Sequence, residues 1–229
     1  IMLFNRIRFI LFLIVINVNF IYGQQPSDFV NLSESIPSLV VSLRYGTSKN
    51  FLGRVVKGYE NPKPLGTSAM AEALQCVQKK LKKRNVGLIL YDSYRPQKAV
   101  ADFLEWASDS SDTIMKRYFY PDHKKEQLFK LGFIASKSGH SRGSTVDVGL
   151  VEWKGDSYTV IDMGSAWDYF GPEAATGYNN LTKQQQENRA LLQNCMELCG
   201  FKPYEKEWWH FTLKSEPYPN TYFNFSMHP

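Results

Sequence analysis

The stretch Ser138-Gly139-His140-Ser141-Arg142-Gly143-Ser144-Thr145-Val146-Asp147 is the one around which the rest of this chain is organised. Its serines and glycines make a small-residue loop, the kind of sequence that lets backbone come close to another group. The apolar run that continues to Val151 predicts a strand, which places His140 on the loop and Asp147 on the strand. Taken alone, this pattern fits metal binding and a plain glycine turn with a hydrogen-bonded histidine equally well.

A second stretch near the end of the chain, Glu207-Trp208-Trp209-His210, also combines an acid with a histidine. It opens a run, 207–213, that reads as the final strand. Considered by itself, it is better explained as an ordinary edge strand whose histidine packs beside Trp209. If the stretch belongs to a site, the two tryptophans are expected to form a dry wall between the acid and the histidine.

Together the two stretches supply two histidines and two acids. Catalytic zinc is commonly held by three protein ligands and keeps a fourth position open for water. His140, Asp147 and His210 match such a ligand set, with one zinc ion per chain. Glu207 is then left over as the base that takes a proton from that water. The combination predicts a zinc hydrolase.

Arg95 adds a third component, in Asp92-Ser93-Tyr94-Arg95-Pro96. It follows an apolar run, 87–92, that predicts a strand buried on both faces, and loops at such strand ends often carry function. An arginine there could stabilise the oxyanion that forms when water attacks a carbonyl. The local sequence slightly favours the alternative, a salt bridge to Asp92.

The remaining pattern mixes helices and short strands without a regular alternation. We therefore expect an α+β fold with a mostly antiparallel central sheet and flanking helices. The residue periodicity and the capping residues predict the main helices at 69–83, 97–107 and 183–199 and further strands at 40–45 and 158–161.

Residues 1–23 have the features of a secretory signal peptide: Arg6 and Arg8, an apolar run, and Gly23 at the expected cut. Residues 24–229 are long enough for one domain. The signal features predict a secreted or periplasmic protein with no stable membrane span once the signal is removed; an uncleaved N-terminal anchor is the less favoured alternative. Without the two arginines the net charge falls from +5 to +3, and no basic run is interleaved with aromatics. A nucleic-acid partner is not expected.

The chain has three cysteines, Cys76, Cys195 and Cys199, an odd number that leaves at least one thiol free. Either all three are buried apolar residues, or Cys76 bridges one of the other two. Two further histidines, His123 in Pro121-Asp122-His123 and His228 near the C-terminus, belong to no comparable motif and are expected at the surface. In a eukaryotic host, three Asn-x-Ser/Thr sites could carry glycans: Asn31, Asn180 and Asn224.

These motifs give the chain a specific resemblance, which spans most of the part after residue 23 in the expected order. It resembles the D-alanyl-D-alanine dipeptidases of the zinc D,D-peptidase family M15. The shared pattern is Ser-x-His-x-x-Gly-x-x-x-Asp followed by Glu-x-x-His, with Tyr-Arg-Pro upstream, and it is met here by Ser138, His140, Gly143, Asp147, Glu207, His210 and Tyr94-Arg95-Pro96. The resemblance also covers the stretch Met163-Gly164-Ser165-x-Trp167-Asp168, in which Trp167 stands where phenylalanine is usual.

The resemblance implies roles for particular residues. His140, Asp147 and His210 would bind zinc, and Glu207 would act as the base and then protonate the leaving amine. Arg95 would stabilise the tetrahedral intermediate. The substrate would be a small D-amino-acid dipeptide, D-Ala-D-Ala, contacted by Asp168 at its ammonium group and also by Ser138 and Tyr45. The implied fold is the zinc-peptidase fold shared with D,D-carboxypeptidases and the hedgehog signalling domain.

Two alternatives remain at this point. A D,D- or L,D-carboxypeptidase would use the same zinc site on longer cell-wall peptides and would not need Asp168 to hold a free ammonium. A catalytically silent zinc-binding protein would need neither Glu207 nor Arg95. The presence of both residues favours an enzyme.

Overall fold

The computed structural model describes residues 24–227, so the predicted signal peptide at 1–23 and His228 lie outside the described residues. The α-helices are α1 (Leu32–Ser35), α2 (Ser68–Lys82), α3 (Gln97–Ser108), α4 (Lys116–Phe119), α5 (Lys125–Leu131) and α6 (Lys183–Leu198). The strands are β1 (Phe29–Asn31), β2 (Val40–Val41), β3 (Leu65–Thr67), β4 (Val86–Asp92), β5 (Thr145–Lys154), β6 (Ser157–Val160), β7 (Phe201–Tyr204) and β8 (Glu207–Leu213). Three single 3-10 turns complete the set: η1 (Arg44–Gly46), η2 (Gly139–Arg142) and η3 (Pro172–Ala174).

The central sheet has the strand order β2-β4-β5-β8-β7, and β6 forms a hairpin with the outer half of β5. Only the short β2–β4 pair is parallel, and every other pair is antiparallel. The expected α+β fold with a mostly antiparallel sheet is therefore confirmed. A separate two-stranded sheet, β1–β3, joins the start of the described chain to the residues before α2.

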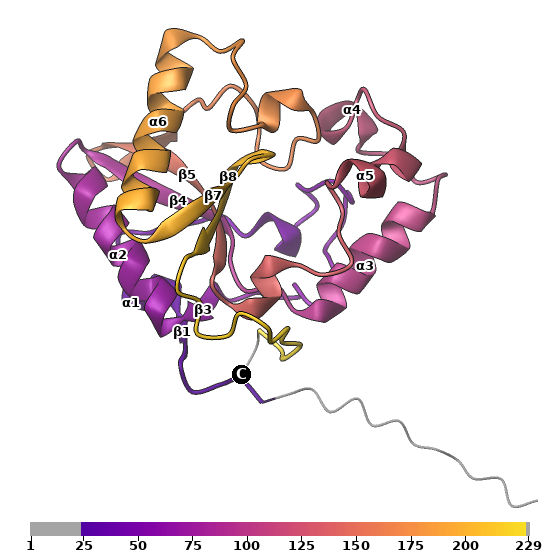
Figure 1. Ribbon diagram of the computed structural model, residues 1–229, viewed down its shortest axis with the longest axis horizontal. Helices are drawn as coiled ribbons and strands as arrows, with labels where there is room; N and C mark the ends of the chain where they lie inside the picture. Colours follow the sequence, from indigo (N-terminus) through magenta and orange to yellow (C-terminus); the bar gives the residue numbers. More distant parts are fainter. Residues whose placement is uncertain (1–23, 228–229) are drawn as a thin grey trace, which may run out of the picture.

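Helices cover both faces of the sheet (Figure 1). On one side lie α2 and α6, which contact each other and the strands beneath them. A disulfide between Cys76 on α2 and Cys199 at the end of α6 joins these two helices, while Cys195 is a buried free thiol. On the other side lie α3, α4 and α5 (Figure 1). All seven residues of β4 are buried, as expected for a strand covered on both faces.

The main helices begin and end where their sequence signals predict. The Thr67 hydroxyl accepts a hydrogen bond from the backbone N–H of Met70 at the start of α2, and Thr182 forms a capping box with Gln185 at the start of α6. Gly200 follows α6 with a φ of 93°, in the left-handed region that glycine tolerates. Such local signals suffice because capping requires only residues within one turn of the helix end.

Some predicted elements differ from the observed ones in length, and some observed strands were not predicted. The strand expected at 40–45 stops at Val41, and the chain then turns into η1, which carries Tyr45. The chain between α3 and α5 contains only α4, a single helical turn. Strands β1, β3 and β7 were not predicted, because segments of three or four residues show too little alternation to be recognised.

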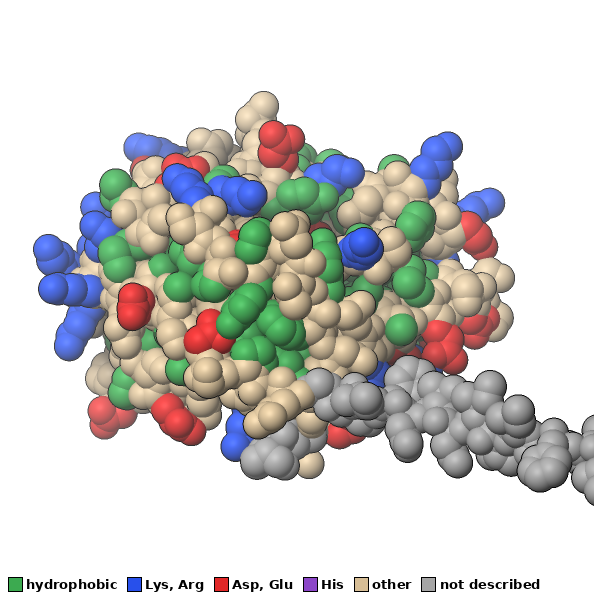
Figure 2. Space-filling view, turned by 60° about the horizontal axis from the view of Figure 1, so that its bottom comes forward, with side chains coloured by type: hydrophobic (Ala, Val, Ile, Leu, Met, Phe, Trp, Pro, Cys, Tyr) green, Lys and Arg blue, Asp and Glu red, His purple; other side chains and the backbone are tan. Residues whose placement is uncertain are grey.

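The surface carries both charge signs. On the face shown in Figure 2, lysine and arginine side chains lie mainly at the edges, with acidic side chains between them and apolar side chains in the middle. Within residues 24–227, none of the helices is long and apolar enough to cross a membrane.

Candidate active site

His140 is held by the short turn η2. The Ser138 side chain accepts a hydrogen bond of 3.3 Å from the His140 backbone N–H, which caps the turn. The turn ends at Gly143, whose φ of 82° suits glycine. A Cβ at Gly143 would collide with the ring of Phe29, so glycine is also required for packing. The small-residue loop thus fixes His140, which is 1% exposed.

Asp147 and His210 lie opposite each other on neighbouring strands. The register of β5 and β8 pairs them directly, and such cross-strand neighbours have their Cβ atoms within about 5.5 Å. On the other side of β5, Asp147 is paired with Asp92 of β4. The sheet register therefore brings one acid and one histidine together from positions 63 residues apart in the chain, since 210 minus 147 is 63.

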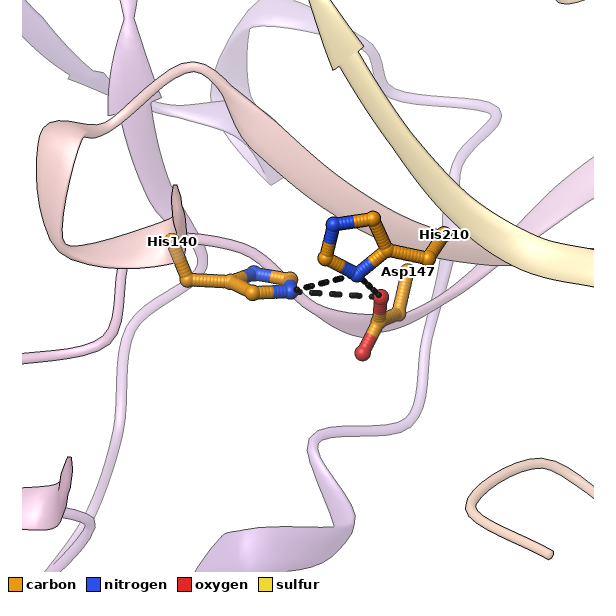
Figure 3. Close-up of side chains that lie close together, drawn as sticks. All are labelled: His140, Asp147 and His210. Carbon is orange, nitrogen blue, oxygen red and sulfur yellow. Dashed lines mark hydrogen bonds and ion pairs between the residues drawn. The ribbon is translucent and has the colours of Figure 1, made fainter. Parts of the chain in front are cut away.

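The two histidines and Asp147 form one cluster (Figure 3). Asp147 Oδ1 lies 3.2 Å from His140 Nε2 and 3.1 Å from His210 Nδ1. The two ring nitrogens are 3.3 Å apart. Each residue offers one ligand atom, and these atoms all lie within 4.8 Å of one another.

The hydrogen-bond partners show that this cluster fits a cation. His140 Nδ1 lies 2.8 Å from the carbonyl oxygen of Ser93, which can only accept, so Nδ1 carries the proton and Nε2 presents a lone pair. Asp147 Oδ1 is buried and accepts no hydrogen bond. The lone pair of His140 Nε2 and the unpartnered Asp147 Oδ1 therefore face each other beside His210 Nδ1. Two imidazoles and a carboxylate are a ligand set that zinc favours.

Asp147 is ionised at ordinary pH. Burial alone would raise its pKa, but the interactions with His140 and His210 lower the pKa well below its usual range. Its second oxygen, Oδ2, accepts a hydrogen bond of 3.2 Å from the indole N–H of Trp167. The Trp167 ring is itself held between Tyr45 and Tyr91. The carboxylate is therefore turned so that Oδ1 faces the histidines.

Replacing Trp167 with phenylalanine, the residue usual at this position in the family, should weaken metal binding by about 10-fold, the lower end of the usual effect of losing a hydrogen bond that orients a ligand. The substitution keeps an aromatic ring and removes the N–H that Asp147 accepts. Titration of the metal-free protein with zinc against a chelating dye measures the affinity. Trp153→Phe is a matched control on the β5–β6 hairpin. Equal affinity in the Trp167 variant and the wild type would show that the N–H does not orient Asp147.

Glu207 reaches the same cluster because the strand is irregular. In a regular strand, residues three apart face opposite sides. Between β7 and β8, however, the register shifts: Pro203 pairs with Phe211, but Tyr204 pairs with Glu207. Such an irregularity re-aims a side chain. As a result Glu207 Oε2 lies 3.4 Å from His210 Nδ1.

The environment of Glu207 makes it a weaker acid than an ordinary glutamic acid. Burial is the largest cause; the charge of His210 opposes the shift and the charge of Asp147 adds to it, and the pKa of Glu207 rises to about 7. A carboxylate with a pKa near neutrality is well matched to taking up and returning a proton.

Arg95 makes the salt bridge that its local sequence favours, and it also reaches the cluster. Its Nε and Nη2 atoms lie 2.9 Å and 2.8 Å from Asp92 Oδ2, and its guanidinium stacks on the rings of Tyr45 and Phe103. The second nitrogen is also 3.9 Å from Asp147 Oδ2. Burial lowers the pKa of Arg95, but Asp92 and other nearby groups raise it further, so the net pKa is well above its ordinary value. The arginine remains a cation.

Asp168 is also buried, and Tyr45 holds it by a hydrogen bond. The Tyr45 hydroxyl donates a hydrogen bond of 2.7 Å to Asp168 Oδ2, and Asp168 is 6% exposed with a φ of 62°. A positive φ is uncommon for aspartate and is often found at functional sites. Burial raises the pKa of Asp168 well above its usual range, while the hydrogen bond from Tyr45 lowers it and the charge of Asp147 raises it further. A bound cation would favour the ionised form.

All eight predicted site residues line one cavity of about 210 Å³, between the sheet and the side of the molecule that carries α3 and α5: Tyr45, Arg95, Ser138, His140, Asp147, Asp168, Glu207 and His210. The expected wall of Trp208 and Trp209 was wrong. Trp209 is 1% exposed in the core, and the Trp208 indole donates to Ser165, so neither lines the cavity. The aromatic part of the wall comes instead from Phe51, Phe103, Phe133, Phe170 and Tyr204.

Two contributions to the site were not recognised in the sequence. The Ser93 carbonyl sets the proton position on His140, and Trp167 orients Asp147. Neither has a local sequence signal, because each contact joins residues from different strands or loops.

Comparison with known proteins agrees with the family resemblance of the sequence motifs. Residues 25–228 match the family Peptidase M15, described as D-ala-D-ala dipeptidase. A D-alanyl-D-alanine dipeptidase from Enterococcus faecalis is 38% identical over 201 residues, which cover 88% of this chain and 98% of that protein. The corresponding enzyme from Enterococcus faecium is 36% identical over 87% of this chain and 98% of its own length. A relative from Escherichia coli is 27% identical over 84% of this chain and 89% of its own length.

Proposed function

Because the chain belongs to the Peptidase M15 family of D-ala-D-ala dipeptidases, we propose that it hydrolyses D-Ala-D-Ala with one zinc ion held by His140, Asp147 and His210. The observation that carries this proposal is the convergence of the three ligand atoms beside Glu207 in a cavity that Arg95 also lines. Bound zinc would lower the pKa of a water ligand and polarise the substrate carbonyl.

Glu207 is proposed as the group that moves the proton. Its carboxylate lies next to the ligand cluster without being part of it, at 3.4 Å from His210 Nδ1. It takes a proton from the attacking water and later gives it to the amine that leaves. A single carboxyl group can do both, because its pKa of about 7 makes both protonation states accessible near neutral pH.

Arg95 is proposed as the cation that faces the developing oxyanion. Asp92 fixes the guanidinium by two contacts to one oxygen, and the aromatic rings of Tyr45 and Phe103 lie against it. A cation that is already fixed in place needs no reorganisation when charge develops, which is how such groups lower the barrier. The salt bridge to Asp92 thus supports this role.

Asp168 and Tyr45 are proposed to recognise the free ammonium of the dipeptide, with Ser138 lining the cavity beside them. A buried carboxylate next to a small cavity favours a cationic group, since an unpaired buried charge is costly. This feature distinguishes a dipeptidase from a carboxypeptidase, whose substrates have an acylated nitrogen at that position.

Asp168→Asn is therefore expected to lower kcat/KM for D-Ala-D-Ala by about 10- to 100-fold, the effect of losing a charge-assisted hydrogen bond. Any residual turnover of an N-acylated D-Ala-D-Ala peptide, which has no ammonium group, should not fall with it. Both rates are measured by release of D-alanine. Asp162→Asn, on the same loop but outside the cavity, serves as the control. Equal losses on the two substrates would assign Asp168 to general support of the site.

The proposed function is tested by assaying metal-analysed protein on the free dipeptide beside the N-acylated peptide. Cleavage of the free dipeptide alone, lost with a chelator and restored by zinc, supports the dipeptidase. Cleavage of the acylated peptide would instead assign a carboxypeptidase. No turnover of either by protein with zinc fully bound would leave a silent zinc-binding protein.

We also propose that residues 1–23 are removed on export and that residues 24–229 form the secreted dipeptidase. The Cys76–Cys199 disulfide supports export, because such bonds persist in oxidising compartments. N-terminal sequencing of the protein collected from a secreting host tests this, and a start at Gln24 is expected.

A further inference from the structure

The proposed substrate is a zwitterion, and only one of its two charges has a partner so far. Asp168, which is buried and lines the cavity, is the proposed partner of the ammonium group. A free dipeptide also has a carboxylate, which an extended chain of two residues places about 7 Å away. Binding that carboxylate at the cavity without a cationic partner would be unfavourable, because part of its hydration is lost.

Among the described residues, Arg95 and Lys137 are the lysine and arginine side chains that line the cavity. Arg95 is engaged by Asp92 through both Nε and Nη2 and lies near the ligand cluster, where the carbonyl reacts. That leaves Lys137 as the cation available for a group farther along the substrate.

Lys137 has no acidic partner of its own in the described part of the chain. The side chain is exposed at the mouth of the cavity, three residues before His140, and its ammonium takes part in none of the ion pairs there. Its contact is with the ring of Tyr222, whose centroid lies 5.5 Å from Nζ. A cation on an aromatic face keeps its charge available to an incoming anion, because the ring neutralises none of it.

Tyr222 is itself held in place, so it can position Lys137. Arg142 stacks on the same ring at 5.6 Å and lies 3.5 Å from the tyrosine hydroxyl. Glu216 binds Arg142 with two hydrogen bonds, of 2.7 Å and 2.8 Å. Because Arg142 belongs to η2, these contacts connect the Tyr222 ring to the turn that carries His140.

We propose that the Lys137 ammonium binds the C-terminal carboxylate of the dipeptide and makes the enzyme specific for substrates with a free C-terminus. This inference rests on the proposed function. Asp168 then binds one end of the zwitterion in the buried part of the cavity, and Lys137 binds the other end at its mouth. Together they select a molecule of two residues with both termini free.

The test compares D-Ala-D-Ala with its C-terminal amide. Lys137→Met should reduce kcat/KM for the acid by about 10- to 100-fold, mainly through KM, because a hydrogen-bonded ion pair is lost. It should leave the amide unaffected, so the preference for the acid disappears, and Lys137→Arg should retain most of that preference. Lys130→Met, an exposed lysine on α5 outside the cavity, is the control. An unchanged preference in Lys137→Met would overturn the proposal.

A second measurement separates this proposal from the proposed function. In zinc-loaded Glu207→Gln protein, calorimetry gives the affinity for the acid and for the amide without any turnover. If Lys137→Met in that background weakens binding of the acid alone, the carboxylate site stands even where catalysis is not detected. If it changes the affinity for acid and amide equally, or for neither, Lys137 does not recognise the carboxylate.

Discussion

Replacing Glu207 with glutamine is expected to reduce kcat by about 10²- to 10⁴-fold, the range attributed to a positioned general base. Glutamine has nearly the same shape but cannot accept a proton from water. Glu207 is not one of the three converging ligands, so the metal should remain bound. The measurement is kcat on D-Ala-D-Ala, together with the zinc content of the same preparation.

Glu205→Gln is a suitable control for this prediction. Glu205 is exposed in the turn before β8 and lies outside the cavity, so its replacement should leave kcat unchanged. Near wild-type turnover in zinc-loaded Glu207→Gln protein would show that the base assignment is wrong.

The same carboxyl group sets the direction of the pH dependence. As the proposed base, Glu207 must be ionised to accept a proton, so activity should fall as the pH falls through its pKa. That pKa is about 7 without a metal, raised chiefly by burial. A nearby cation favours the carboxylate, so in the zinc enzyme the acidic limb should lie below about pH 7.

Replacing His210 with alanine should abolish both metal binding and turnover. Mutating a group that only orients a metal ligand typically lowers metal affinity by about 10- to 100-fold. Losing a ligand itself should therefore lower the affinity by more than about 100-fold. Asp147 Oδ1 and His140 Nε2 would remain as two ligand atoms, too few for a stable zinc site. Zinc content after dialysis against a buffered chelator, followed by kcat, measures both effects.

His123→Ala provides the comparison, since its ring contacts Phe133 outside the ligand cluster. Both variants should be checked by circular dichroism for an intact fold. Full zinc retention in folded His210→Ala protein would exclude His210 as a ligand.

Much of the site could be predicted from short-range patterns. The loop that ends in Gly143 and the strand after it place His140 and Asp147, and both positions follow from residue type within ten positions. The capped helices α2 and α6 were predictable for the same reason. Resemblance to a known family then added Asp168 and Tyr45, which have no local signal of their own.

Short-range patterns failed where the position of a side chain depends on a distant strand. Glu207 and His210 are an odd number of residues apart on one strand, and only the register shift against β7 lets both reach the cavity. The two tryptophans between them were expected to line the cavity, but their positions also depend on distant segments. Trp209 is buried in the core, and the Trp208 indole donates a hydrogen bond to Ser165.

The sequence by itself determined which chemical groups this protein has and which local elements carry them, because caps, turns and apolar periodicity act over a few residues. Only the tertiary structure decided how those groups are oriented. Contacts between distant segments put the proton of His140 on Nδ1, turn Asp147 towards the histidines and place Lys137 on Tyr222. Such contacts depend on sheet register and packing, which no single stretch of sequence specifies.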